Sequence, residues 1–596
     1  MVLFDFFFRI GFNDFMSVEK NFKKKSANTK KSTKKSKPKR RFRYCLIGSV
    51  FSIIAFILSV FFVVQVLKLN ILPMHLVLPL SAIVICMAAI LLILMNFITK
   101  GKISKLICGV LSIALCIGLF VGNNYLYKTS TMFDSVTNLT SQITNTVSVL
   151  VMNESGLTSL DQLEGKTVAT VAEADSDATK RCLKDIKKED VNIETVDFTN
   201  YAESLGALFN HEVDAMLLNE AYRGALHEIE GFTGFANMTT SLHKTIYYTP
   251  REHVLEASKD AVNVVSEPFT VLISGNDSYG SLQEVSRSDV NMLVTINPKS
   301  HTILMTSIPR DYYLPVACPP DVKDCPKGQN DKLTHTGLYG VSTTEKTIEA
   351  SLDIDINYYV RVNFSSLVNL VDALGGIDVD VPEGLEVETF YANGTPGVHA
   401  GINHLDGERA LAFARERKAY QDGDIQRNKN QQQVLMQMVR KIASPDMIVN
   451  FGKFMDALSG AFETNMSADN MLSLIRYEFT FFPDWKFEQY NVDGYQDILF
   501  CPILGTEASV NVGNTQAMEI AKDKIQAVCK GKSSNSVKKE VDPNIYSPFL
   551  DGVDDMPMPQ QSPVEEYIEE EPVYYGEPQY SDEVPYVEEG YEEIQY

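Results

Sequence analysis

The residues best suited to chemistry are arginines and aspartates at the two ends of one short stretch, Ser286–Pro315. It reads SRSDVNMLVTINPKSHTILMTSIPRDYYLP, with Arg287 and Asp289 before its first apolar run and Arg310 and Asp311 after its second. Guanidinium groups bind phosphate oxygens through paired hydrogen bonds, and carboxylates bind hard divalent cations. A simple salt bridge would not require this symmetry. The pattern therefore predicts a site that handles both a phosphate and a metal ion.

A further carboxylate precedes this stretch. Asp277 ends the segment PFTVLISGND, which is predicted to be a short buried strand. In α/β folds, ligands bind at the carboxyl ends of strands. Asp277 and Asp289 could therefore converge on Mg²⁺, with Mn²⁺ as an alternative, because both ions prefer oxygen ligands.

More arginines occur in GERALAFARERKAYQDGDIQRNKNQQQVLMQMVRKI. The pattern predicts a helix that ends near Arg415 and Arg417, a polar loop, and a long helix that begins near Asp424. Arg427 lies in the first turn of the long helix, where a cation opposes the helix dipole, and Gln431 follows one turn later. Each arginine taken singly reads as an ordinary surface charge. The set taken together favours phosphate binding.

A pair of strands must position the opening stretch. Val290–Ile296 and Thr302–Ile308 are predicted strands joined by the turn NPKS. An antiparallel pair with a short turn places its outer ends side by side. The arginine and aspartate at the start of the stretch should then lie beside those at its end.

Charge is distributed unevenly along the 596 residues, whose net charge is −22. Between Lys20 and Arg43 there are thirteen basic and no acidic residues, and from Val541 onward there are sixteen acidic and no basic residues. We expect a cytoplasmic basic head at 1–43, attracted to anionic membrane lipid rather than to nucleic acid. We expect a disordered acidic tail at 533–596.

Three apolar runs follow the basic head, Tyr44–Leu67, Ile71–Ile98 and Leu106–Val121. Their lengths predict three transmembrane helices within 44–125. The basic head and the loop TKGKISK would face the cytoplasm, because positive loops stay inside. Everything after about Asn123 would then lie outside the cell.

Residues 126–260 are predicted to form an extracellular accessory α/β domain. From Asn153 to Pro250, segments such as GKTVATV, DATKRCLKDI and NIETVDF alternate between strand and helix. LDQLEGKTVATV and ALFNHEVDAMLLNEAY resemble parts of type II solute-binding domains. A structural spacer without a ligand is an equal alternative.

Cysteines suggest where disulfides could form. Cys318 and Cys325 lie in the Pro-rich loop ACPPDVKDCPKG and are predicted to be bridged on the oxidising side of the membrane. Cys501 and Cys529 could form a second pair.

Seven ordered motifs resemble the LytR–CpsA–Psr family of bacterial cell-wall assembly proteins. They are ISGND, RSD, SIPRDYYLP, DKLTHTG, INYYVRVNFSSLVNLVDALGGIDVDVP, HLDGERALAFARER and GDIQRNKNQQQ. The resemblance implies an α/β/α catalytic domain, which we place at 261–532, with a hydrophobic cavity for a polyprenyl-phosphate lipid. It also implies Mg²⁺-dependent transfer of a phosphoglycosyl polymer from a polyprenyl pyrophosphate carrier to a hydroxyl of peptidoglycan.

The resemblance also implies roles for residues at motif positions. The metal ligands would be Asp277 and Asp289, the pyrophosphate clamp Arg287, Arg310, Arg415 and Arg417, and the further substrate-binding positions Lys332, Arg427, Gln431, Asp424 and Asp311. Asp311 could instead simply orient Arg310. Two residues depart from the family pattern, since Asn430 stands where a second arginine is usual and Thr334 where an asparagine is common.

The segment LVNLVDALGG offers candidates for the lipid cavity. Its apolar residues are Leu367, Val368, Leu370, Val371 and Leu374. They could line the cavity or form ordinary helix core.

The expected fold class is therefore α/β, with three N-terminal transmembrane helices, a solute-binding-like lobe and an α/β/α domain. Three functions compete. The preferred one is a membrane phosphotransferase that attaches a teichoic-acid- or capsule-like polymer to peptidoglycan. The alternatives are a polyprenyl-pyrophosphate hydrolase and a non-enzymatic envelope sensor or regulator.

Overall fold

The structure is a computed structural model of the chain. It describes residues 40–69, 74–137, 142–172, 175–229, 231–250, 261–277, 282, 284–320, 322, 325–421, 423–444, 447–458 and 460–541. The predicted basic head lies almost entirely outside these residues, as does most of the predicted acidic tail.

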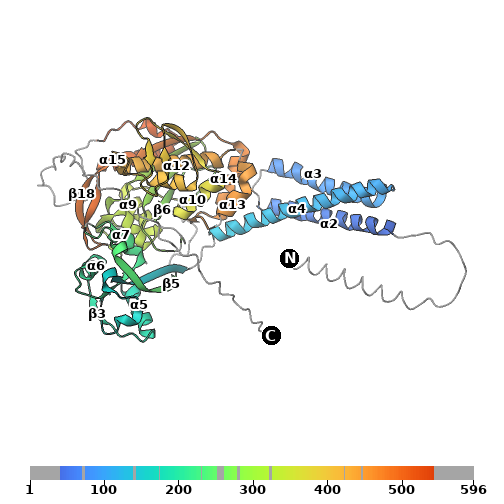
Figure 1. The fold of residues 1–596 in the computed structure, drawn as a ribbon. Coiled ribbons are helices and arrows are strands. Elements are labelled where there is room, and N and C mark those ends of the chain that lie inside the picture. Colours follow the sequence, from blue (N-terminus) through green and yellow to red (C-terminus); the bar gives the residue numbers. More distant parts are fainter. Residues whose placement is uncertain are drawn as a thin grey trace, which may run out of the picture. The chain divides into compact units, whose positions relative to one another are not determined.

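Three long apolar helices open the described chain and lie side by side (Figure 1). They are α2 (Arg40–Leu69), α3 (Met74–Ile93), which continues as the π-helix η1 (Leu94–Ile98), and α4 (Lys102–Thr137). Each contains an apolar span of 23 to 28 residues, long enough to cross a membrane. The three predicted transmembrane helices are confirmed. The third is longer than expected, because the helix continues beyond the apolar run.

The accessory domain is built on a five-stranded mixed sheet of order β3-β2-β4-β1-β5. Its strands are β1 (Gln142–Met152), β2 (Thr167–Thr170), β3 (Glu194–Asp197), β4 (Ala215–Asn219) and β5 (Thr239–Pro250). Its helices are α5 (Ser176–Lys188), α6 (Tyr201–Phe209), α7 (Arg223–His227) and α8 (Phe235–Met238), with the 3-10 turns η2 (Asn153–Ser155), η3 (Leu160–Leu163) and η4 (Glu220–Tyr222). The predicted alternation of strand and helix is confirmed, because β2, β3 and β4 are parallel and are joined through helices.

The two longest strands of this sheet, β1 and β5, are not marked by the sequence pattern. β1 and β5 pair with each other in antiparallel register along their whole length, and β1 also pairs with β4. Both strands are rich in threonine and other polar residues, so the apolar pattern alone does not mark them. The resemblance of this domain to solute-binding domains stays a prediction.

The central sheet of the second domain has six strands in the order β16-β11-β6-β7-β8-β17. They are β6 (Phe269–Gly275), β7 (Val290–Asn297), β8 (Thr302–Ile308), β11 (Tyr358–Val362), β16 (Glu463–Thr464) and β17 (Lys486–Asn491). β7 and β8 form the predicted hairpin, with Asn291 opposite Ile308. β6, which ends just before Asp277, lies beside β7.

Helices cover both faces of this sheet (Figure 1). Leu272, Leu293 and Leu304 pack on one face against α9 (Val341–Leu352) and α15 (Thr515–Cys529). Alternate residues such as Met292 and Met305 pack on the other face against α12 (Gly423–Ile442), and α14 (Ala468–Phe481) also covers that face. Alternation of this kind is what a strand buried on both sides requires. The predicted α/β/α layering is confirmed.

Smaller elements surround the three layers. A second sheet contains β9 (Tyr312–Pro315), β10 (Asn330–Lys332), β18 (Gly494–Cys501) and β19 (Thr506–Gly513), and two ribbons pair β12 (Ile377–Val381) with β15 (Gly401–Leu405) and β13 (Val387–Thr389) with β14 (Pro396–Val398). The remaining helices are η5 (Leu333–Tyr339), α10 (Phe364–Ala373), α11 (Gly407–Arg415), α13 (Met447–Leu458) and η6 (Ser534–Ser536).

The segment proposed for the lipid cavity forms α10 and its C-terminal turn. Leu370, Val371 and Leu374 are buried in a hydrophobic core shared with α11, α12 and α13, and Leu367 packs against that core. This packing supports the helix-core alternative for these residues.

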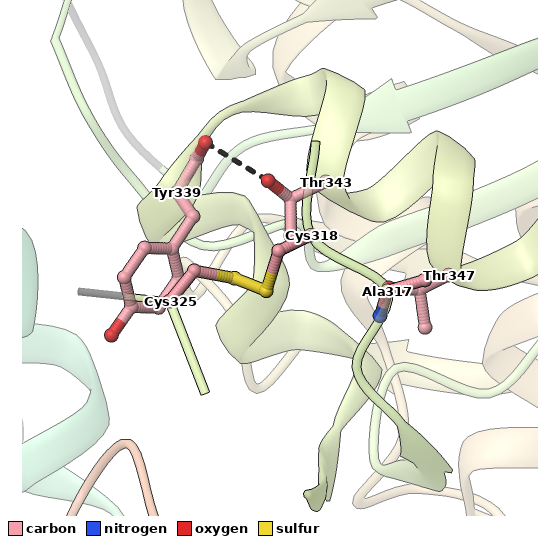
Figure 2. Close-up of a disulfide and its surroundings, with 6 residues drawn as sticks. All are labelled: Ala317, Cys318, Cys325, Tyr339, Thr343 and Thr347. Atoms are coloured by element: carbon pink, nitrogen blue, oxygen red, sulfur yellow. Dashed lines mark hydrogen bonds between the residues drawn. A yellow bond between two sulfur atoms is a disulfide. The ribbon is translucent and has the colours of Figure 1, made fainter. Parts of the chain in front are cut away.

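One of the two possible disulfides is present. Cys318 and Cys325 are bridged beside α9, where the backbone N–H of Ala317 donates to Thr347 Oγ1 over 3.1 Å (Figure 2). The second possible disulfide, between Cys501 and Cys529, is not formed, because both residues are free thiols. Cys501 is buried at the end of β18, whereas Cys529 is the last residue of α15 and packs at the edge of a different core cluster.

Candidate active site

The β7–β8 hairpin brings the two ends of the Arg/Asp stretch together, as predicted. Asp289 immediately precedes β7, and its backbone N–H donates to the carbonyl of Gly275 over 2.8 Å. Arg310 follows β8, and its Nη1 donates to Asp289 Oδ2 over 3.1 Å. The antiparallel pairing therefore creates an ion pair between residues 21 positions apart.

The two aspartates predicted to bind a metal meet at one guanidinium. Arg287 Nη2 donates to Asp277 Oδ2 and lies 3.6 Å from Asp289 Oδ2. Both carboxylates thus contact the same nitrogen. Carboxylates are the ligand type that Mg²⁺ prefers, and Mg²⁺ is commonly bound through one or two carboxylates and several waters.

Asp311 and Lys332, the last residue of β10, complete the cluster. Lys332 Nζ lies 3.3 Å from Asp311 Oδ1, and Asp311 Oδ2 lies 3.4 Å from Arg310 Nε. Asp311 therefore contacts both predicted phosphate-binding cations, in agreement with an orienting role. We call Asp277, Arg287, Asp289, Arg310, Asp311 and Lys332 the hairpin cluster.

Thr334, one of the two departures from the family pattern, takes part in the same network. Its hydroxyl donates to Asp289 Oδ1 over 2.7 Å, and its backbone N–H donates to the carbonyl of Arg310 over 2.8 Å. Gly337 allows η5 to lie this close, because a Cβ there would stand 2.5 Å from the backbone nitrogen of Ser288. The threonine thus holds an Asp289 oxygen in place.

A second group of predicted residues lies where α11 ends and α12 begins. Asp424 Oδ1 lies 3.2 Å from Arg427 Nη2 and 3.8 Å from Arg417 Nη1. α11 starts at an Asp406 N-cap that accepts from the N–H of Arg409, and it ends at Arg415, so Arg417 lies in the loop that follows. We call Arg417, Asp424 and Arg427 the helix cluster.

Two predicted residues are held differently. The Arg415 guanidinium stacks over the Phe364 ring, 4.3 Å from its centre, and Gln431 Nε2 donates to the carbonyl of Ala414 over 3.3 Å. Asn430, the other departure from the family pattern, is buried and donates to the carbonyl of Phe413. In the described part of the chain, Arg415 forms no ion pair with either cluster, and the amides of Gln431 and Asn430 hydrogen-bond to backbone carbonyls instead.

One charged residue of the site was not found by sequence reasoning. Glu228 caps the C-terminus of α7 in the accessory domain. Its Oε1 lies 2.9 Å from Arg287 Nη1 and 2.9 Å from Arg310 Nη2, and its Oε2 lies 4.0 Å from Lys332 Nζ. No motif includes this position, and nothing local in HEIEG distinguishes it from a surface glutamate.

The charges influence one another strongly because they are buried. Burial alone would raise the pKa of Glu228, but Arg310 and Arg287 outweigh it and lower that pKa to about 2. Burial would likewise raise the pKa of Asp289, and Arg287 and Arg310 lower it instead. Burial and the neighbouring Asp289 raise the pKa of Asp277. Two nearby carboxylates therefore differ in how readily they ionise.

The arginines keep unused capacity to donate hydrogen bonds. Within the described residues, the buried Nε atoms of Arg287 and Arg427 have no hydrogen-bond partner, whereas Arg310 Nε has an ion-pair contact of 3.4 Å with Asp311 Oδ2. Buried N–H groups are normally paired, so unpaired ones point to an absent acceptor. An anionic ligand with several oxygens would supply it.

A model of the LytR_cpsA_psr family matches residues 234–496. A second family model, described as DNA polymerase processivity factor, matches residues 102–218, a range that includes the apolar helix α4. Glu228 lies outside both ranges.

Two relatives carry the name polyisoprenyl-teichoic acid–peptidoglycan teichoic acid transferase TagU. The one from Bacillus mycoides (strain KBAB4) is 32% identical over 252 residues, which are 42% of this chain and 77% of the relative. The one from Bacillus cereus (strain AH820) is 36% identical over 210 residues, which are 35% of this chain and 64% of the relative. The chain thus spans somewhat less than two thirds of the second relative's length.

A solved structure is similar as well. The crystal structure of B. subtilis TagV aligns with 44% of this chain and 98% of its own, at 28% identity and a TM-score of 0.37. The family model and the 32% identity over most of a relative's length lead to one conclusion. The chain belongs to the LytR–CpsA–Psr family.

Proposed function

We propose that this protein is a membrane-anchored transferase that attaches a cell-wall glycopolymer to peptidoglycan. Family membership and the teichoic acid transferase names of its relatives support this proposal. The observation that carries it is the pair of buried arginines, Arg287 and Arg310, held by carboxylates at the two ends of one hairpin. The donor would be a glycan linked to a polyprenyl diphosphate.

Transfer from a diphosphate mainly requires a protein to position the reactants and to stabilise negative charge. Arg287 and Arg310 would bind the diphosphate oxygens, and the unpaired Nε–H group of Arg287 would donate to one of them. A peptidoglycan hydroxyl would attack the phosphorus that bears the sugar. One phosphorus–oxygen bond forms, the bond to the polyprenyl phosphate breaks, and the hydroxyl proton is released.

Asp277 and Asp289 would hold a divalent cation, Mg²⁺ or Mn²⁺. Both carboxylates contact Nη2 of Arg287, and this common cationic partner supports a cation-binding position for the pair. When bound there, the ion would offset charge on the diphosphate. Thr334 would keep Asp289 oriented through its 2.7 Å hydrogen bond.

The catalytic domain would face the outside of the cell. Three lysines lie where the second and third apolar helices meet, Lys100 in the loop and Lys102 and Lys105 in the first turn of α4, which favours a cytoplasmic position for this end. The chain after α4 then emerges on the side where peptidoglycan lies.

The decisive assay measures release of polyprenyl phosphate from a lipid-linked glycan, using the full chain in detergent with Mg²⁺. A transferase releases it only when peptidoglycan oligomers are present, and a phosphodiester-linked product appears. Equal release without acceptor would replace the proposal with a hydrolase. Absence of release under both conditions would favour a non-enzymatic role.

A further inference from the structure

The accessory domain reaches into the hairpin cluster through Glu228. One carboxylate oxygen lies 2.9 Å from a nitrogen of each buried arginine, and the other faces Lys332. Both oxygens therefore point at cations. This arrangement suits an anion held between two guanidiniums and does not suit a ligand for a divalent cation.

The contact is a closely packed one. Gly224, in the same short helix α7, lies so close to Arg287 that a Cβ there would stand 2.9 Å from Nη2 and 3.2 Å from Cζ. A glycine at this position lets the helix backbone lie against the guanidinium. The helix and its terminal carboxylate thus cover Arg287, whose side chain is only 5% exposed.

The two domains also meet at other points. Thr144 of β1 forms a parallel β-bridge with Glu284, just before the Arg/Asp stretch. Asn200 Nδ2 donates to the carbonyl of Gly505 over 3.5 Å. Glu228 is therefore held against the site by a domain that is docked elsewhere as well.

Formal charges show what the carboxylate does to the site. The hairpin cluster has three cations (Arg287, Arg310 and Lys332) and three carboxylates (Asp277, Asp289 and Asp311), so it is neutral without Glu228 and carries one negative charge with it. A diphosphate brings further negative charge to the same arginines. The Glu228 carboxylate and a diphosphate bound to the same arginines would repel each other strongly, because two negative charges interact strongly in a buried site.

We propose that Glu228 is a built-in competitor of the substrate diphosphate. Its carboxylate occupies the position of a diphosphate oxygen between Arg287 and Arg310, and the accessory domain must withdraw it before the substrate binds. This inference rests on the proposed function, because it assumes that the two arginines bind the diphosphate. It gives the accessory domain a defined task, the control of substrate affinity.

Replacing Glu228 should leave the fold intact. Arg287 would keep its contacts with Asp277 and Asp289, and Arg310 would keep Asp289 and Asp311. No buried guanidinium would be left without a carboxylate. Glu228→Gln therefore removes the competing charge while the cluster stays paired.

The test measures the Kd of inorganic pyrophosphate for the full chain in detergent, by calorimetry and without divalent cations. We expect Glu228→Gln to bind pyrophosphate at least about tenfold more tightly than the wild type, since the competing anion is gone. Glu220→Gln is the matched control. It makes the same change in the same domain at similar exposure (24% against 27%), but Glu220 pairs with Arg223 outside the site, so Kd should not change.

A second variant, Glu228→Asp, makes a smaller change at the same position. It keeps the charge but shortens the side chain, so its Kd for pyrophosphate should lie between those of the wild type and Glu228→Gln. If neither Glu228 variant binds pyrophosphate more tightly than the wild type, Glu228 is not a competitor.

Arg310→Ala separates this inference from the proposed function. It should abolish pyrophosphate binding, because it removes one of the two guanidiniums. If Arg310→Ala binds as the wild type does, the arginine site itself is wrong. If Arg310→Ala loses binding while Glu228→Gln gains none, only the role of Glu228 is refuted.

Discussion

The hairpin cluster and the helix cluster contain arginines to which the family resemblance assigns one role, yet the structure places them in different surroundings. Arg287 and Arg310 are 5% and 9% exposed, and each contacts at least two carboxylates. Arg417 is 46% exposed and lies 3.8 Å from a single carboxylate, that of Asp424. Breaking a buried charge pair costs far more stability than breaking an exposed one. We therefore expect Arg287 and Arg310 of the hairpin cluster to contribute to both stability and ligand binding. We expect Arg417 of the helix cluster to contribute mainly to ligand binding.

Arg427 connects the two groups. It is buried, and burial lowers its pKa, but its nearest carboxylate is Asp424 of the helix cluster. Arg310 and Asp289 of the hairpin cluster also influence that pKa. The two clusters therefore act on each other electrostatically, although no ion pair joins them within the described residues.

The largest effect should follow from Asp289→Ala. It removes one of the two carboxylates that Arg287 and Arg310 share, so that only Glu228 contacts both, and it leaves Thr334 without its acceptor. Removing one partner of a buried ion pair costs roughly 3–5 kcal/mol. We expect a clearly lower Tm and no divalent-dependent transfer. Asp177→Ala is the control, because it breaks only the exposed ion pair with Arg181 and should cost about 0–1 kcal/mol. Equal Tm values for the two variants would show that Asp289 contributes no more to stability than a carboxylate of an exposed pair.

Arg310→Lys tests whether a buried arginine also binds substrate. Lysine keeps the charge but cannot form two parallel hydrogen bonds to a diphosphate. Losing one charge-assisted hydrogen bond costs roughly 1.5–3 kcal/mol, which is about a ten- to hundredfold lower kcat/KM. Steady-state transfer kinetics and Tm are measured on the same sample. Normal kcat/KM with a lowered Tm would assign Arg310 to structure alone.

Arg417→Ala should produce the opposite pattern. Its exposed ion pair contributes little, so Tm should stay close to that of the wild type. We expect Arg417 to contact the substrate about as strongly as the partners of an exposed ion pair contact each other, which is roughly 0.2–1 kcal/mol. Losing that contact would lower kcat/KM by up to about fivefold. Steady-state transfer kinetics, as used for Arg310→Lys, measure this fall in kcat/KM. A marked loss of Tm would show that Arg417 belongs with the structural arginines.

The smallest effect concerns pH. The arginines hold the Glu228 carboxylate ionised down to a pKa of about 2, below the ordinary value of 4.5. A lowered folded-state pKa gives stability that is full above about pH 4.5 and is lost as the pH falls toward 2. The difference in Tm between wild type and Glu228→Gln should therefore be constant from pH 7 to about 5 and should narrow below about 4.5. A constant difference down to the lowest measurable pH would contradict the ion pairs of Glu228.

Local patterns in the sequence determined much of this protein. Uninterrupted apolar runs marked the three long apolar helices, short apolar runs marked β6, β7 and β8, and a polar break marked the end of α11 and the start of α12. Close spacing in a Pro-rich loop indicated the disulfide between Cys318 and Cys325. Each of these features depends on residues near one another in the chain, so a local pattern can reveal it.

Only the tertiary structure decided how the charges are shared. The sequence could not show that Cys501 stays a free thiol, that Arg415 stacks on a ring while Arg310 is buried among carboxylates, or that β1 and β5 pair although β2, β3 and β4 lie between them in the chain. It could not show Glu228 either, since one glutamate in a helix end looks like any surface charge. The physical reason is common to all four: burial and pairing arise from contacts between segments that are distant in the chain, and such contacts set both the strength and the role of a charged side chain.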